Sequence, residues 1–292
     1  MKAIIKNAKA KVNLFLHVND KRADGYHFLE SLVAFAEVKD ILEFYPQKNI
    51  ELDIKGKFAK NLLQEEAAAQ NIVIRAAEII QNKYAKDKGA KIVLTKNIPV
   101  GAGLGGGSSD AAATIEGLCE LWELDLSNDE KQDLGIKLGA DVPVCLLGKP
   151  AFVSGIGEKL LEIKTLPEFN IVLVNPNIYL STKRVFERGF LNFSEEINTN
   201  FSETEDYDDY IEILSSTRND LEENAKELVP EINDILNVLA SSEGALIARM
   251  SGSGATCFAI FKTKSQAENC AKKIRAENPQ WWVENTVIEN SL

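Results

Sequence analysis

A glycine-rich run at residues 99–109 is the stretch of the chain best suited to chemistry. It reads P-V-G-A-G-L-G-G-G-S-S and holds five glycines within seven residues. Glycine has no Cβ, so its backbone N–H groups stay uncovered and its backbone can adopt left-handed angles. The run leads into a predicted helix, whose first N–H groups have no partner inside the helix and lie at the positive end of its dipole. The run therefore predicts a cradle for phosphate oxygens.

The two serines that close the run, Ser108 and Ser109, can act in two ways. Either side chain can cap the following helix. Either hydroxyl can also reach a phosphate or a magnesium ion. The sequence gives no set of metal ligands, and Ser109 is the one candidate that we name.

Other interpretations of the run stay open at this point. A flexible turn is the simplest, but five glycines at a strand–helix junction disfavour it. Gly101, Gly103 and Gly106 satisfy the dinucleotide pattern G-x-G-x-x-G, which expects a strand running directly into the first glycine and an acidic residue about 20 positions later. Here Pro99 intervenes, and the chain stays helical after Ser109. The Walker A pattern fails because no lysine follows the last glycine.

The elements predicted around the run indicate two α+β domains, residues 1–160 and residues 161–292. Alternating apolar residues predict strands at residues 10–18, 41–45, 50–54, 91–95, 170–174, 246–250, 256–262 and 281–288. Helical spacing and caps predict helices after Asn71 and at residues 109–122, 127–139, 218–228, 231–241 and 265–277. The acidic stretch at residues 195–209 is interpreted as a solvated loop.

Composition excludes several classes of function. Nucleic-acid binding needs a basic face, and the formal net charge of −11 argues against one. No apolar window is long enough for a membrane helix, and the N-terminus lacks a signal core, so we expect a cytoplasmic protein without a membrane partner. The four cysteines form no C-x-x-C pair and only two histidines are present, which disfavours a disulfide framework and a histidine-rich metal site.

The run at residues 99–112 resembles the central motif of the GHMP kinases. Three segments resemble the branch of that family that phosphorylates the 2-hydroxyl of 4-diphosphocytidyl-2-C-methyl-D-erythritol in non-mevalonate isoprenoid synthesis. They are A-K-V-N-L-F-L at 10–16, R-A-D-G-Y-H at 22–27 and G-A-D-V-P at 139–143, and M-S-G-S-G-A-T-C-F at 250–258 resembles the family's third motif. The resemblance implies a two-domain fold, with an N-terminal α/β domain that carries the phosphate loop and a ferredoxin-like C-terminal α+β domain.

The resemblance also implies roles for individual residues. Asp141 becomes the general base, with Lys11 beside it to stabilise the transferred phosphoryl group. Taken alone, Lys11 is an ordinary strand lysine and Asp141 a turn or capping residue, so the conjunction of motifs favours catalysis. The implied ATP-binding residues are Asn71, Pro99, Val100, Gly101, Ala102, Gly103, Leu104, Gly105, Gly106, Gly107, Ser108 and Ser109. The implied substrate-binding residues are Asn13, Tyr26, His27, Thr182, Phe186, Gly252, Ser253 and Gly254.

Among these residues, His27 is expected to recognise the cytidine base, whereas His17 alternates with the apolar face of its strand and is interpreted as structural. The resemblance implies ATP and Mg²⁺, a small-molecule substrate and a monomer or homodimer. A relative acting on homoserine or mevalonate is the alternative of the same class, and the D-G-Y-H element disfavours it. A flavin or nicotinamide oxidoreductase and a non-catalytic nucleotide-binding module are the alternatives of other classes.

Overall fold

The computed structural model describes residues 3–65, 71–190, 192–197, 201, 204 and 206–288. Its contacts divide the chain into two compact units. The first unit comprises Met1–Ala10, Val38–Val100 and Gly105–Gly148, and the second comprises Lys11–Glu37, Gly101–Leu104 and Lys149–Leu292. Each unit is therefore assembled from separate stretches of chain. This division by contacts differs from the predicted domain boundary at residue 160, which cuts the sequence at a single point. That boundary stays a prediction.

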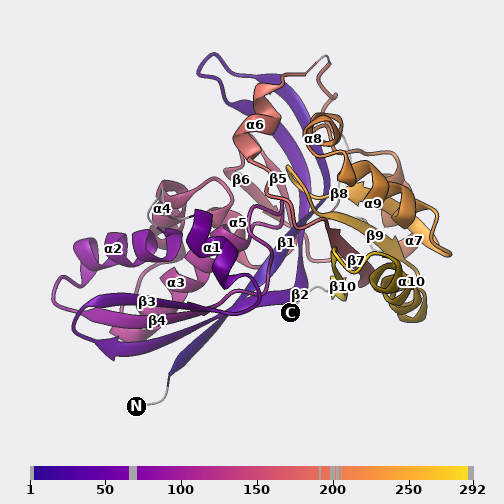
Figure 1. Cartoon of the computed structure of the whole chain (residues 1–292). Coiled ribbons are helices and arrows are strands. Elements are labelled where there is room, and N and C mark those ends of the chain that lie inside the picture. The colour runs from indigo at the N-terminus through magenta and orange to yellow at the C-terminus, as the bar shows by residue number, and fades with distance from the viewer. Residues whose placement is uncertain are drawn as a thin grey trace. The chain divides into compact units, whose positions relative to one another are not determined.

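The first unit packs helices against a small sheet. In the sheet, β4 (Gly89–Thr95) pairs in parallel with β3 (Ile50–Lys55) and antiparallel with the end of β2 (His27–Gln47). The helices α2 (Ile72–Tyr84) and α3 (Gly106–Trp122) pack together beside these strands (Figure 1). Apolar side chains from both layers, among them Phe44, Ile92, Ile80 and Leu118, form one buried core. The remaining helices of this unit are α1 (Ala59–Glu65), α4 (Asn128–Leu138) and α5 (Val142–Leu147).

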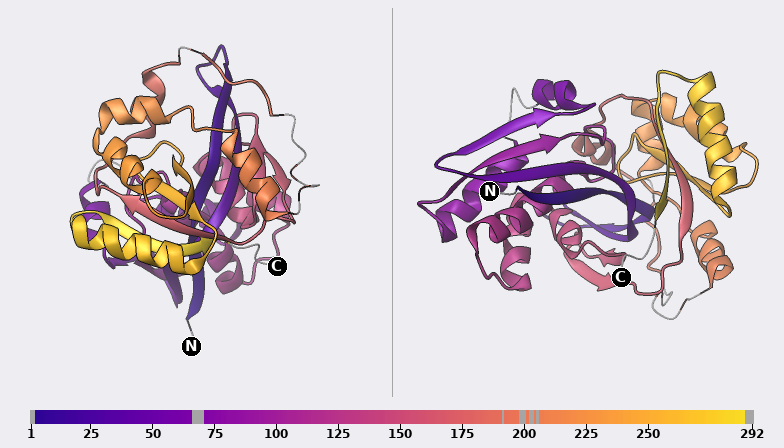
Figure 2. Two further views of the ribbon diagram at one scale, coloured as in Figure 1. Left: turned by 90° about the vertical axis from the view of Figure 1, so that its right-hand side faces the viewer. Right: turned by 90° about the horizontal axis from the view of Figure 1, so that it is seen from below.

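The second unit is built on an antiparallel sheet. Its strands β10 (Trp282–Ile288), β7 (Phe169–Asn175), β9 (Cys257–Phe261) and β8 (Ala245–Met250) pair in that order. The helices α9 (Glu231–Ala240) and α10 (Lys264–Glu277) cover one face, and Figure 2 shows α10 along these strands. On α7 (Tyr207–Ser215), the Tyr207 ring lies 5.4 Å from the ring of Phe169 in β7. The same unit holds β5 (Ala151–Ser154), β6 (Lys159–Glu162), α6 (Thr182–Glu187) and α8 (Glu222–Leu228).

The predicted α+β architecture is confirmed, and the differences are local. β1 (Ile4–Lys21) and β2 are longer than predicted and pair with each other. β5, β6, α1 and α5 were missed, because each is too short to show a clear period. α8 begins at Glu222, four residues later than the helix expected from residue 218.

The acidic stretch at residues 195–209 is only partly the loop that was predicted. α7 begins inside it at Tyr207, capped by the Asp206 carboxylate, which accepts a hydrogen bond from the Asp208 N–H. Tyr210 and Leu214, four residues apart, bury one face of this helix, a pattern that the density of charge obscures. Residues 198–200, 202, 203 and 205 of this stretch lie outside the described residues. Within the described residues, no helix combines the length and apolar character needed to cross a membrane.

Candidate active site

The first half of the glycine run, residues 101–104, is fixed in the second unit by its carbonyl oxygens. Three hydrogen bonds join Thr256 N to Ala102 O, Ser251 Oγ to Gly103 O and Lys11 N to Leu104 O, at 3.1, 3.0 and 2.8 Å. A trans peptide directs its N–H opposite to its C=O, so the N–H groups that follow these carbonyls face away from the anchors. Within the described part of the chain, none of these three N–H groups donates a hydrogen bond. The run thus presents consecutive donors suited to an anion.

Two glycines let the glycine run and the 250–258 motif meet backbone to backbone. Gly103 has a φ of +71°, and a Cβ there would lie 2.3 Å from the carbonyl oxygen of Ser251. Gly252 has a φ of +55°, and a Cβ there would lie 2.9 Å from Gly103 O and 3.2 Å from Asn13 Oδ1. Any side chain at either position would push these segments apart. The second unit therefore brings together Asn13, Gly103 and Gly252.

The second half of the run begins α3, in the first unit. The N-cap is Gly105, with a φ of 61°, and the helix starts at Gly106, so the prediction that Ser108 or Ser109 caps it is wrong. Gly105 supplies the left-handed conformation at the N-terminal boundary of α3, so the helix begins before the two serines. Ser108 and Ser109 therefore lie within its first turns. The opening N–H groups of α3 point out of the helix end, where an anion is favoured.

Ser109 and Asn71 each have a defined structural partner. The buried Ser109 hydroxyl donates to the carbonyl oxygen of Lys9 at 2.8 Å, which leaves its lone pairs as acceptors. The Asn71 side chain accepts from the Val73 N–H at 2.7 Å, which confirms its predicted capping role on α2. A Cβ on Gly107 would lie 3.8 Å from Cγ2 of Ile72, so the beginnings of α2 and α3 are neighbours.

The two residues expected to be catalytic occupy contrasting environments. Lys11, in β1 of the second unit, is only 4% exposed. Asp141, in the first unit, is exposed at the N-cap position of α5, with φ −88° and ψ −9°. The Asp141 side chain makes no capping hydrogen bond to that helix. Its carboxylate is therefore not committed to the capping role that a turn aspartate usually has.

Two of the residues expected to bind the substrate, His27 and Phe186, form part of an aromatic cluster in the second unit. The His27 ring lies 5.2 Å from the ring of Phe186 and 5.1 Å from that of Phe190. Partial burial, with a smaller contribution from Lys21, lowers the pKa of His27 below its ordinary value. His27 is therefore neutral at pH 7, with one ring nitrogen as donor and the other as acceptor. Tyr26 is 61% exposed.

Two further predicted substrate residues are joined directly. The hydroxyls of Thr182 and Ser253 share a hydrogen bond of 2.7 Å. Gly254 closes the same segment with a φ of +85°. The structure thus groups Thr182 with the 250–258 motif, while His27 and Phe186 form a second group within the same unit.

His17 does not join either group. It is buried beside Phe15, its Nε2 accepts from the Arg218 N–H at 3.3 Å, and burial is the largest cause of a lowered pKa. These contacts agree with the structural role expected from its place in the strand.

Sequence reasoning missed one group of charged residues next to the run. Lys96, Asp40 and Asp110 are buried together in the first unit. The sequence does place two of them beside the glycine run, since Lys96 stands three residues before Pro99 and Asp110 directly follows Ser109. Only the structure reveals that the charges are buried, because charged side chains are usually exposed.

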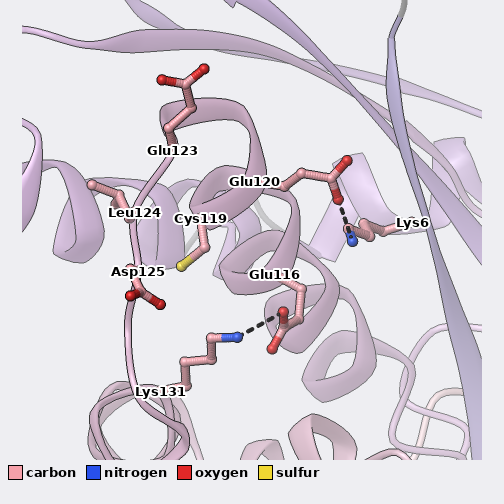
Figure 3. A pocket seen from close by; sticks show the side chains of 8 residues that line it. All are labelled: Lys6, Glu116, Cys119, Glu120, Glu123, Leu124, Asp125 and Lys131. Carbon is pink, nitrogen blue, oxygen red and sulfur yellow. Dashed lines mark hydrogen bonds and ion pairs between the residues drawn. The ribbon is translucent and has the colours of Figure 1, made fainter.

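An open surface pocket of about 370 Å³ lies at the other end of α3 (Figure 3). It is lined by Lys6, Glu116, Cys119, Glu120, Glu123, Leu124, Asp125 and Lys131. Its two lysines already pair with Glu120 and Glu116, at 2.7 and 3.0 Å. The surplus of carboxylates disfavours phosphate, and none of the predicted site residues lines this pocket.

Comparisons with known proteins relate the chain to one family of kinases. A sequence profile described as the GHMP kinases N terminal domain matches residues 71–149, and one described as GHMP kinases C terminal matches residues 201–280. The 4-diphosphocytidyl-2-C-methyl-D-erythritol kinase of Rhizobium etli is 42% identical, covering 97% of this chain and 94% of that protein. The same-named protein of Ruegeria pomeroyi is 43% identical, covering 94% of this chain and 95% of that protein.

Solved structures show the same likeness. A crystal structure of 4-(cytidine 5'-diphospho)-2C-methyl-D-erythritol kinase is 31% identical with a TM-score of 0.79, covering 98% of this chain and all 100% of that one. The homoserine kinase of Cytophaga hutchinsonii shares the fold, with a TM-score of 0.70, 15% identity and coverage of 99% and 95% of the two chains. At that identity the likeness concerns the fold alone.

Proposed function

The chain belongs to the GHMP kinase family and is an ATP-dependent small-molecule kinase, and we propose that its acceptor is the 2-hydroxyl of 4-diphosphocytidyl-2-C-methyl-D-erythritol. The observation that supports this best is the junction of the two glycine motifs at Gly103 and Gly252, beside Asn13. This junction sets a row of N–H donors, unpaired among the described residues, next to residues of the A-K-V-N-L-F-L segment. An anion-binding surface adjoining polar side chains suits transfer of a phosphoryl group to an alcohol.

In the proposed reaction the glycine run holds the triphosphate. The N–H groups of residues 103–105 and of the first turn of α3 bind its oxygens. The 2-hydroxyl oxygen attacks the γ-phosphorus, a new O–P bond forms and the bond to the bridging oxygen of ADP breaks. The Asp141 carboxylate accepts the hydroxyl proton, and the Lys11 ammonium stabilises the charge on the transferring group.

Recognition of the cytidine base is assigned to His27 and the aromatic residues near it. A neutral imidazole offers one donor and one acceptor, so His27 can either accept from the amino group or donate to the ring nitrogen, the two groups that distinguish cytosine from uracil. Phe186, in contact with His27, supplies an apolar ring for the base to stack on. Tyr26, exposed in the neighbouring turn, is a second stacking partner, and Thr182, Ser253 and Gly254 contribute polar contacts to the substrate.

Magnesium accompanies the nucleotide in this proposal. The described residues contain no group of three or more acidic, histidine or cysteine side chains able to hold a metal, which suits an ion bound mainly by phosphate oxygens. The Ser109 hydroxyl is the protein ligand we propose, and the ion would neutralise charge on the triphosphate. A cytoplasmic location, the absence of a nucleic-acid partner and a monomeric or homodimeric state stay predictions.

The test is ADP release measured by a coupled assay with four acceptors: the cytidyl substrate, its uridyl analogue, homoserine and mevalonate. The highest kcat/KM is expected with the cytidyl compound, by at least about a hundredfold over the two small acids, because they cannot use the base-binding residues. A higher kcat/KM with homoserine or mevalonate would contradict the proposed substrate. ATP consumption that no acceptor stimulates would contradict the proposed transfer.

A further inference from the structure

Lys96 lies at the centre of a buried ion cluster in the first unit. Its ammonium contacts Oδ2 of Asp40 at 2.6 Å and Oδ2 of Asp110 at 2.5 Å, and Lys96 is 2% exposed. Burial opposes a charge on Lys96, but the two carboxylates outweigh burial and raise the pKa of the ammonium. Lys96 is therefore a buried cation held by two buried acids.

The cluster ties together the two places where the chain enters and leaves the glycine run. On the entering side, Oδ1 of Asp40 accepts the N–H groups of Asn97 and Ile98 at 2.5 and 2.9 Å. On the leaving side, Asp110 lies within the opening turns of α3. Lys96 Nζ bridges the two sides, and a Cβ on Gly106 would lie 3.1 Å from it. The ammonium is thus packed against the start of the helix that follows the run.

The charges within the cluster do not balance. Two carboxylates meet one ammonium, and Oδ1 of Asp110 is buried without a hydrogen-bond partner among the described residues. Burial is the largest cause that raises the pKa of Asp110, to about 7, and the nearby Asp40 carboxylate adds to it, while Lys96 acts in the opposite sense. The helices α2 and α5 pack against α3 and add mostly apolar side chains to the shared core. The Cys145 thiol of α5 contacts Ser109.

We propose that Lys96, Asp40 and Asp110 are positioning residues for ATP, which hold the two ends of the glycine run at a fixed separation. This inference rests on the proposed role of the run. Because the Lys96 ammonium contacts both carboxylates, loss of either contact releases one end of the run from the other.

Two substitutions at Asp110 distinguish a role in positioning ATP from a role in the stability of the fold alone. Asp110→Ala removes the link to Lys96, whereas Asp110→Asn keeps an oxygen that accepts from Lys96 and removes the surplus charge. Asp110→Ala is expected to raise the KM for ATP about tenfold or more while the KM for the cytidyl substrate stays unchanged. Asp110→Asn is expected to restore the KM for ATP. Glu116→Gln is the matched control, because it removes a carboxylate ion-paired to Lys131 on the same helix without touching the cluster.

The second measurement is calorimetry of ATP binding, which gives the Kd for ATP directly. Wild type, Glu116→Gln and Asp110→Asn are expected to bind ATP with similar Kd values, whereas Asp110→Ala is expected to bind it about tenfold or more weakly. If Asp110→Ala fails to fold, Asp110→Leu, which is similar in size and cannot accept from Lys96, takes its place. A folded Asp110→Ala protein with the wild-type KM for ATP would overturn the positioning role. If wild type does not bind ATP at all, the proposed function fails instead.

Discussion

Ser251 donates a hydrogen bond from its Oγ to the carbonyl oxygen of Gly103 at 3.0 Å, across 148 positions of sequence. The same Oγ accepts the backbone N–H of Asn13 at 3.1 Å. One hydroxyl therefore joins the glycine run, the 250–258 motif and β1. Because the Gly103 carbonyl is held in this direction, the following N–H faces away from the anchor, where the proposed phosphate binds.

Gly103→Ala is expected to weaken ATP binding by about tenfold or more and to destabilise the fold by roughly 1–3 kcal/mol. The added Cβ would lie 2.3 Å from the backbone oxygen of Ser251, so the two segments must separate. Steady-state kinetics at varied ATP and thermal unfolding would measure the two effects.

Gly189→Ala is the matched control for that substitution. Gly189 has a φ of +76°, close to the +71° of Gly103, but a Cβ there meets nothing within 4 Å. Gly189→Ala therefore has the energetic cost of a left-handed backbone at alanine, without a collision between the new Cβ and another segment. If both variants lose the same stability and the same ATP affinity, the contact between the two glycine motifs does not position the run.

His27→Ala is expected to raise the KM for the cytidyl substrate by roughly ten- to a hundredfold, with little change in the KM for ATP. His27→Phe keeps an aromatic ring against Phe186 and Phe190 but has no hydrogen-bonding edge. It should recover part of the affinity and none of the preference for cytidine over uridine. Kinetics with both analogues on the three proteins would decide this, and an unchanged preference would place base recognition elsewhere.

The stability of the protein should fall in mild acid because of His17. Burial is the main cause of its lowered pKa, so below the unfolded value of about 6.5 the unfolded state binds more protons than the folded one. The free energy of unfolding therefore decreases as the pH falls below that value, and the stability that His17 contributes is present above it. His17→Gln removes the titration and keeps an acceptor for Arg218.

Urea unfolding of both proteins between pH 7 and 5 would measure this effect. Wild type should lose stability relative to His17→Gln by at most about 1.4 kcal/mol per pH unit. The other histidine, His27, is present in both proteins, so its contribution cancels. Parallel pH profiles would mean that His17 is protonated equally in the folded and unfolded chain.

Much of the fold could be predicted from local pattern. The helix after Asn71 and the strand at residues 50–54 carry clear periods and caps, and the structure has both. The start of α3 could not be placed, because glycine at 105 supplies its boundary by backbone conformation, whereas the prediction relied on serine side chains. α5 was missed since six residues are too few for a helical period.

In the candidate site too, some residues could be predicted from the sequence and others could not. The glycine run was recognisable because its proposed function depends on backbone that glycine alone leaves uncovered. The cluster of Lys96, Asp40 and Asp110 was not, because sequence gives no measure of burial and the three residues are spread from 40 to 110. The contact between His27 and Phe186 was hidden too, since it joins residues 159 positions apart through the fold alone.

The most direct test of the proposed function is phosphorus NMR of the reaction between ATP and 4-diphosphocytidyl-2-C-methyl-D-erythritol, with wild type and Asp141→Asn. Wild type should produce ADP and one new phosphomonoester, located on the 2-hydroxyl, with the diphosphate of the substrate intact. Asp141→Asn should form the same product roughly 10²–10⁴ times more slowly while binding ATP normally. Phosphate on another oxygen, free inorganic phosphate as the main product, or undiminished turnover in the variant would contradict the account.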